Sequence, residues 1–185
     1  MVSAKRLIER ELRKLVGLGV YGLARAADML TVGFGKRRPR WIGWILTKRR
    51  RRVALPEFAL HVQDPWRIEI AGSLFTERFD LWRPPGEADR RSPRVDWNRD
   101  YDTKPNLQDQ RMKLLRRRHP YDPRARRLVV ESVRADSRGG AVIDLSHDVR
   151  LAIRPTRTSG EAWRVFRPGS RSKHFVVLGG GVVEG

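Results

Sequence analysis

One pattern occurs twice in this chain of 185 residues: an aliphatic strand-like segment, a break, and then tryptophan, arginine and an aliphatic residue. The first copy runs from Leu60 to Ile68 and the second from Leu151 to Val165. Residues 15–34 and 128–145 precede the two copies, and each stretch has two apolar segments on either side of an Arg-Ala step. A repeat of this kind indicates two similar units that bury one shared core.

The repeat predicts a mainly β (α+β) fold, in which two related halves form one antiparallel sheet or a sandwich-like core. Helical periodicity predicts an N-terminal helix, and Asn106 is a suitable N-cap for a short helix over 106–118. The predicted segments are the helix 1–14, a first β half 15–82 with a basic insertion at 36–52, a connector 83–127 with the short basic helix, a second β half 128–180, and a tail 181–185.

Alternation of apolar and polar residues predicts where the strands lie. The first half has strands at Phe58–Val62, Trp66–Ile70 and Ser73–Leu81. Trp66 and Trp163 are expected to anchor the core rather than to bind a ligand, because a tryptophan on an inward strand face buries a large apolar area. The strands predicted in the second half are 128–133, 141–145, 149–153, 161–166 and 174–178.

The positive charge is concentrated in two segments. Residues 36–52 hold nine basic residues and no acid, and residues 111–127 hold eight basic residues and one acid. These segments carry 16 of the 19 net charges, so the rest of the chain is close to neutral. Such clusters attract polyanions, although they also occur as solvated surfaces. The predicted contacts for nucleic acid or another anion are Arg37, Arg38, Arg40, Trp41, Trp44, Arg49, Arg50, Arg51, Arg52, Arg116, Arg117 and Arg118.

Two apolar stretches could in principle cross or contact a membrane. Residues 15–35 are long enough to span a bilayer, but they contain Arg25, Asp28 and five glycines, so no spanning helix is predicted. The same stretch mimics a signal peptide, but acidic residues precede it, and a cytoplasmic location is expected. Residues 41–46 combine tryptophan and aliphatic residues between basic clusters, which suits a membrane interface or the apolar tip of a hairpin that packs on the body.

Several stretches occur in a characteristic order along the chain. They are LVGLGVYGLARAADMLTVGFG at 15–35, FALHVQDPWRIEI at 58–70, VDWNRD at 95–100, LVVESVRADSRGGAVIDLS at 128–146 and EAWRVFRPGSRSKHFVV at 161–177. They resemble a family of uncharacterised bacterial proteins, mainly actinobacterial, that is known only as a domain of unknown function. The resemblance implies a β-rich fold of two halves and a cytoplasmic protein, and it implies no activity. Segment 36–52 is more uniformly positive than in that family, so its role would be particular to this chain.

The residue types that usually carry catalysis are scarce or badly spaced. The chain has no cysteine, which excludes disulfides, thiolate zinc sites and a cysteine nucleophile. No two of the four histidines have metal-ligand spacing with a third ligand nearby. The consecutive residues Ser146, His147 and Asp148 cannot converge as a catalytic triad and are predicted to form a turn. No catalytic residue, metal or cofactor is therefore predicted.

These observations favour a non-enzymatic binding module whose arginine clusters contact an anionic partner such as nucleic acid. The alternative is a protein-interaction or accessory module, in which the neutral β body binds a protein partner. An interfacial membrane binder and an enzyme with an unfamiliar site also remain open.

Overall fold

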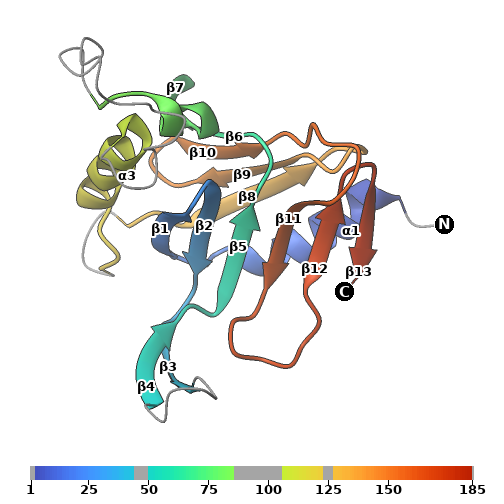
Figure 1. Ribbon diagram of the computed structural model, residues 1–185, viewed down its shortest axis with the longest axis horizontal. Helices are drawn as coiled ribbons and strands as arrows, with labels where there is room; N and C mark the ends of the chain where they lie inside the picture. The colour runs from blue at the N-terminus through green and yellow to red at the C-terminus, as the bar shows by residue number, and fades with distance from the viewer. Residues whose placement is uncertain (1–2, 44–49, 86–105, 123–126, 185) are drawn as a thin grey trace.

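The computed structural model describes residues 3–43, 50–85, 106–122 and 127–184, except the side chains of residues 40–51 and 181–184. The chain is mainly β, with two larger antiparallel sheets, an N-terminal helix and a second short helix (Figure 1). The first sheet contains, in spatial order, β1 (Val20–Ala26), β2 (Met29–Phe34), β5 (Phe58–Val62), β11 (Glu161–Phe166), β12 (Phe175–Leu178) and β13 (Gly181–Glu184). The second contains β7 (Ser73–Glu77), β6 (Trp66–Ile70), β10 (Val149–Ile153), β9 (Ala141–Leu145) and β8 (Val130–Ala135).

The two sheets enclose one core. In β2 and β9 every second residue is buried, as the alternation of apolar and polar residues predicted. Buried apolar side chains from both sheets form a single cluster. Helix α1 (Ala4–Leu12) adds Ile8 and Leu12 to it and packs against β8 and β13. A bridge between Gly19 and Val129 links the start of β1 to the start of β8, so the sheets are joined there by backbone hydrogen bonds.

The strand order of the two sheets follows one scheme. Strands β1, β2 and β5 of the N-terminal half lie in the first sheet, and β6 and β7 cross to the second. Strands β8, β9 and β10 of the C-terminal half lie in the second sheet, and β11 and β12 cross to the first. Apart from the separate pair β3 and β4 and the last strand β13, which extends the first sheet beyond β12, each half therefore gives three strands to one sheet and two to the other. This equivalence supports the repeat inferred from the sequence, but the duplication itself stays a prediction.

The register of the crossing strands is also equivalent. Trp163 at the start of β11 pairs with Val62 at the end of β5. Trp66 at the start of β6 pairs with Ile153 at the end of β10. Both indoles are buried, with exposed fractions of 0% for Trp163 and 3% for Trp66, so both lie in the core as expected.

The two tryptophans differ in one hydrogen bond, which makes them a matched pair for mutagenesis. The Nε1 of Trp163 donates to the carbonyl of Gly139 at 2.8 Å, whereas the Nε1 of Trp66 has no hydrogen-bond partner among the described residues. Replacement by phenylalanine removes similar volume at both sites, but only at Trp163 does it leave a carbonyl without its donor. Trp163→Phe should therefore lower the free energy of unfolding by about 1–3 kcal/mol more than Trp66→Phe. Urea denaturation measures both, and equal losses would contradict this assignment.

Some boundaries differ from those expected from the sequence. Leu15 does not begin a strand but ends a 3-10 turn, Arg13–Leu15, and β1 starts at Val20. The strand expected over Ser73–Leu81 stops at Glu77, because the next five residues form a 3-10 turn. A capping box at Glu77 and Asp80 stabilises the N-terminal end of this turn. The glycine-rich tail is not a tail: Gly181–Glu184 forms β13 and pairs with β12. A glycine at positive φ, Gly180, makes the intervening turn.

The helices are short. The expected helix 1–14 is observed as α1 plus the 3-10 turn, and the expected helix 106–118 is observed as α3 (Leu107–Arg118). Neither helix, nor any other in the described part of the chain, has the length and apolar character needed to cross a membrane. The apolar stretch 15–35 instead supplies β1 and β2.

Candidate polyanion-binding surface

The basic segment 36–52 lies in a separate two-stranded sheet. Strands β3 (Arg38–Gly43) and β4 (Arg50–Leu55) pair with each other and extend away from the two larger sheets (Figure 1). They occupy the connection between β2 and β5, whose ends Phe34 and Phe58 are paired. The equivalent strands β9 and β10 are joined by residues 146–148 alone, as a turn with positive φ at two of its residues. The basic hairpin therefore lies where the repeat predicted an insertion.

At the base of this hairpin the basic side chains face solvent. Lys36, Arg37, Arg38 and Arg52 are exposed, and none makes an ion pair within the described part of the chain. Strands β3 and β4 include the backbones of Arg40, Trp41, Arg50 and Arg51, whose side chains lie outside the description. Trp44 and Arg49 lie outside the described residues altogether, so the two interpretations of segment 41–46 stay predictions.

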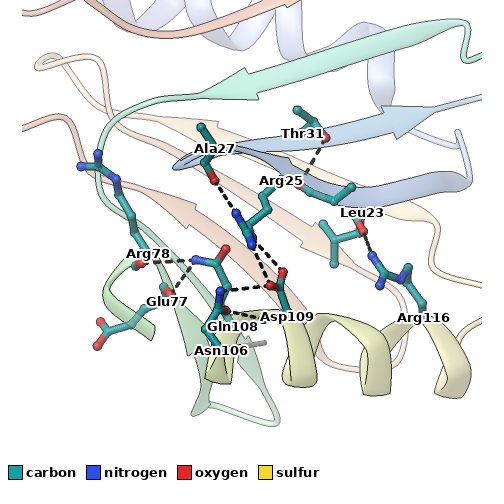
Figure 2. Close-up of polar contacts among 11 residues, drawn as sticks. Leu23, Arg25, Ala27, Thr31, Glu77, Arg78, Asn106, Gln108, Asp109 and Arg116 are labelled. Atoms are coloured by element: carbon teal, nitrogen blue, oxygen red, sulfur yellow. Dashed lines mark hydrogen bonds and ion pairs between the residues drawn. The ribbon is translucent and has the colours of Figure 1, made fainter. Parts of the chain in front are cut away.

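Helix α3 is fixed to β1 at its N-terminal end (Figure 2). The guanidinium of Arg25 donates from Nε and Nη2 to the two carboxylate oxygens of Asp109, each at 2.8 Å. Asn106 caps the helix, because its Oδ1 accepts from the backbone N–H of Asp109 at 2.9 Å. Gln108 donates to the backbone carbonyls of Glu77 and Arg78 at 3.3 and 3.2 Å. These bonds hold one end of α3 against both β1 and the residues after β7.

The C-terminal end of α3 carries three of the predicted contact residues. Arg116 donates from Nη1 to the carbonyl of Leu23 in β1 at 2.5 Å, so part of this side chain holds the helix in place (Figure 2). Arg117 and Arg118 are exposed and make no ion pair with any residue that the structure describes. Positive side chains at this end also stabilise the helix through its dipole. Arg116 therefore has a structural role that the sequence did not predict.

Two tyrosines bring the two basic segments together. The guanidinium carbon of Arg37 lies 3.9 Å from the ring centroid of Tyr21 in β1. Tyr21 packs edge-on against Tyr121, with centroids 5.3 Å apart and an interplanar angle of 74°. The hydroxyl of Tyr121, three residues beyond α3, donates to the carbonyl of Gly35 at 2.6 Å. The hairpin base and the end of α3 are thus neighbours, although about 80 residues separate them in sequence.

A third basic group lies beside the hairpin in the loop between β11 and β12. Residues 167–173 contain Arg167, Arg171 and Lys173 and no acid, and all three side chains are exposed. Arg167 lies over the ring of Phe58 at 4.6 Å and lines a pocket of about 120 Å³ together with Arg38. We call the combined surface the basic end; it consists of Lys36, Arg37, Arg38, Arg52, Arg116, Arg117, Arg118, Arg167, Arg171 and Lys173.

The arginines of the two large sheets, and of the helix, turn and loops next to them, are arranged differently, because acids neutralise most of them. Arg157 pairs with the buried Asp64, and Arg78 pairs with Asp28. Arg150 bonds to Asp144 at 2.7 Å. Further pairs are Arg25–Asp109, Arg67–Glu69, Arg83–Asp80, Arg111–Asp80, Arg134–Asp144 and Arg164–Glu161. Unpaired positive charge is therefore concentrated at the basic end, whereas the sheets carry mostly internal pairs.

Three pKa shifts agree with the separation between unpaired charge at the basic end and ion-paired charge in the sheets. Burial alone would raise the pKa of Asp144, but hydrogen bonds from Arg150 and Ser132 and the charge of Arg134 hold it below its usual value. The hydrogen bond and charge of Asp144 in turn raise the pKa of Arg150. Burial, together with the positive charge of Arg164 and electrostatic coupling to His174, lowers the pKa of His61. At pH 7 Asp144 thus stays ionised and offsets the charge of its arginine neighbours, and His61 stays neutral and adds no positive charge to the sheets.

Metal-ligating residue types do not gather into a metal site among the described residues, which contain no group of three or more side chains placed to hold a metal ion. His147 stacks on His119 at 5.1 Å, and its φ of 63° places it in the turn predicted for residues 146–148.

Comparison of the chain with protein-family models, with curated proteins and with solved structures finds no match. The resemblance to a bacterial family of uncharacterised proteins therefore stays a prediction.

Two features of the basic end were not predicted from the sequence. Residues 167–173 carry the same signal as the longer segments, three basic residues and no acid, but the run is short. The pairing of Tyr21 with Tyr121 has no local signal, because it depends on how α3 docks on β1.

Proposed function

We propose that this chain is a non-enzymatic binding module that contacts nucleic acid through the basic end. The observation that carries the proposal is the proximity of three groups of basic side chains, those of the basic end, which make no ion pair among the described residues, while acids neutralise most of the other described arginines. A guanidinium without an acidic neighbour can form charge-assisted hydrogen bonds to phosphate without first breaking an internal pair. The resulting affinity would come mainly from release of the counterions that phosphates hold.

The proposal predicts a steep dependence of affinity on salt. If six to eight of the ten basic-end residues contact phosphates, the plot of log affinity against log salt should have a slope of about −4 to −6 for a single strand. Fluorescence anisotropy with a labelled oligonucleotide of about 20 nucleotides, between about 50 and 300 mM salt, measures this slope. The absence of binding at the lowest salt, or a slope smaller than about 1 in magnitude, would contradict the proposal.

A protein-interaction module is the second candidate, and one observation favours it. Leu74 in β7, Phe79 in the 3-10 turn and Leu114 in α3 are about half exposed, on three elements that contact one another. Exposed apolar side chains that gather in one region often mark a protein interface. This alternative predicts a stoichiometric protein complex in native mass spectrometry that nuclease treatment leaves intact. Loss of the partner on nuclease treatment would instead favour nucleic-acid binding.

A further inference from the structure

A pocket of about 250 Å³ lies between β1 and the residues that follow α3. Buried aliphatic side chains line it, among them Leu23 of β1, Leu115 of α3 and Leu128 just before β8. The walls carry the rings of Tyr21 and Tyr121, both half-buried. An apolar lining with aromatic walls suits a flat ring, because the ring can pack on both without losing hydrogen bonds.

Two guanidinium groups, those of Arg116 and Arg37, lie at this pocket or beside it. Arg116 and His119 line it directly, and Arg37 lies against the ring of Tyr21. Both guanidinium groups are held in place: Arg116 donates to the carbonyl of Leu23, and the guanidinium carbon of Arg37 lies 3.9 Å from the ring centroid of Tyr21. A ligand that inserts a ring into the pocket would therefore have its attached negative charge next to two guanidinium groups.

Two other pockets at the basic end do not combine these properties. The pocket lined by Arg38 and Arg167 also has the carboxylate of Glu57 in its wall. The pocket at Phe166 and Phe175 also has the carboxylate of Glu11. The pocket between β1 and the residues after α3, which we call the tyrosine pocket, has no carboxylate among the described residues that line it, so none of these residues repels an anion.

We propose that the tyrosine pocket takes an unpaired nucleobase, so that the ligand of the basic end is a single-stranded nucleic acid. This inference rests on the proposed function and adds which form of nucleic acid is bound. Bases in a duplex are stacked and paired, and they cannot enter a side pocket without being flipped out. Unpaired bases stack readily on tyrosine rings and on arginine planes, whatever their identity. The phosphates on either side of the inserted base would then contact Arg37 and Arg116.

The first test compares three ligands on the unmodified protein: fluorescein-labelled oligo-dT of about 20 nucleotides, an abasic strand of the same length, and a duplex of the same length. All carry phosphates, but only oligo-dT offers unpaired bases. Anisotropy should show binding to oligo-dT at least roughly ten-fold tighter than to the abasic strand. Equal affinity for all three would overturn the inference and leave the proposed function standing. No binding to any of them at about 50 mM salt would overturn the proposed function itself.

The second test removes the tyrosine ring but keeps an apolar side chain. Tyr21→Leu should weaken oligo-dT binding by roughly 5- to 100-fold, because base–aromatic stacking is lost. Binding to the abasic strand should fall much less, and the slope against salt should stay close to that of the unmodified protein, because Arg37 loses its stacking partner but keeps its charge. Tyr21→Phe is the matched control and should bind oligo-dT like the unmodified protein. If Tyr21→Leu binds oligo-dT normally, or loses the abasic strand equally, the pocket does not hold a base.

Discussion

Replacing Arg37, Arg38 and Arg52 together by glutamine is expected to weaken binding of single-stranded nucleic acid on the order of 100-fold at about 0.1 M salt. These side chains are exposed at the base of the hairpin and make no ion pair within the described residues. Each phosphate contact contributes about 0.7 to the salt exponent of a single strand, so three contacts contribute about 2. Titrations at several salt concentrations should show the slope falling by that amount.

The matched control removes the same charge from elsewhere. Arg13, Arg138 and Arg154 are also exposed and likewise make no ion pair among the residues described, but they lie outside the basic end. Replacing these three by glutamine lowers the net charge equally and should reduce affinity only a few-fold, through the long-range field. If both triple variants lose the same affinity, binding depends on total charge and not on the basic end.

Asp80→Ala is expected to lower the free energy of unfolding by about 3 kcal/mol. The carboxylate is fully buried, with an exposed fraction of 0%. It accepts hydrogen bonds from the hydroxyl of Thr76 at 3.0 Å, the backbone N–H of Glu77 at 3.2 Å, Arg83 at 3.1 Å and Arg111 at 2.8 Å. Removing it leaves a buried hydroxyl and two guanidinium groups without their acceptor. Both arginines are partly exposed and can regain water, which keeps the loss below the upper end of the range for buried pairs.

Urea denaturation of Asp80→Ala measures this loss, and Glu131→Ala serves as the control. Glu131 is exposed on β8 and makes no ion pair in the described part of the chain, so its removal should change stability by less than about 0.5 kcal/mol. Because Arg111 belongs to α3, Asp80→Ala should also loosen the helix that presents Arg117 and Arg118. If Asp80→Ala lowers the free energy of unfolding no more than Glu131→Ala does, Asp80 does not hold β7, the 3-10 turn and α3 together.

The fold was largely predictable from the sequence where a residue pattern is compatible with only one local structure. The repeated pattern around Trp66 and Trp163 located β5, β6, β10 and β11, because short runs of aliphatic and aromatic residues bounded by breaks are typical of strands that pack in a core. Asn106 located the start of α3, because its side chain satisfies a backbone N–H at the helix end. Strand β13 was missed because Gly181 and the short Val-Val segment give a weak pattern, and pairing with β12 decides its conformation.

The candidate site was predictable only in part, for a related reason. Charge clusters can be read directly from sequence, and they identified Arg37, Arg38 and Arg117. The sequence alone could not predict that these clusters lie close together in the folded chain, because their proximity depends on long-range contacts such as that between Tyr121 and Gly35. The ion pairs that neutralise the sheets are equally non-local, as Arg25 with Asp109 shows.

The claim that the basic end is the binding surface is tested most directly by nuclear magnetic resonance. Labelled protein titrated with oligo-dT should show its largest amide shifts at residues 21–23, 35–38, 116–121 and 167–173, with little change in β8, β9 and β10. Shifts centred on the paired arginines of β8 and β10, or spread evenly over the chain, would contradict the account.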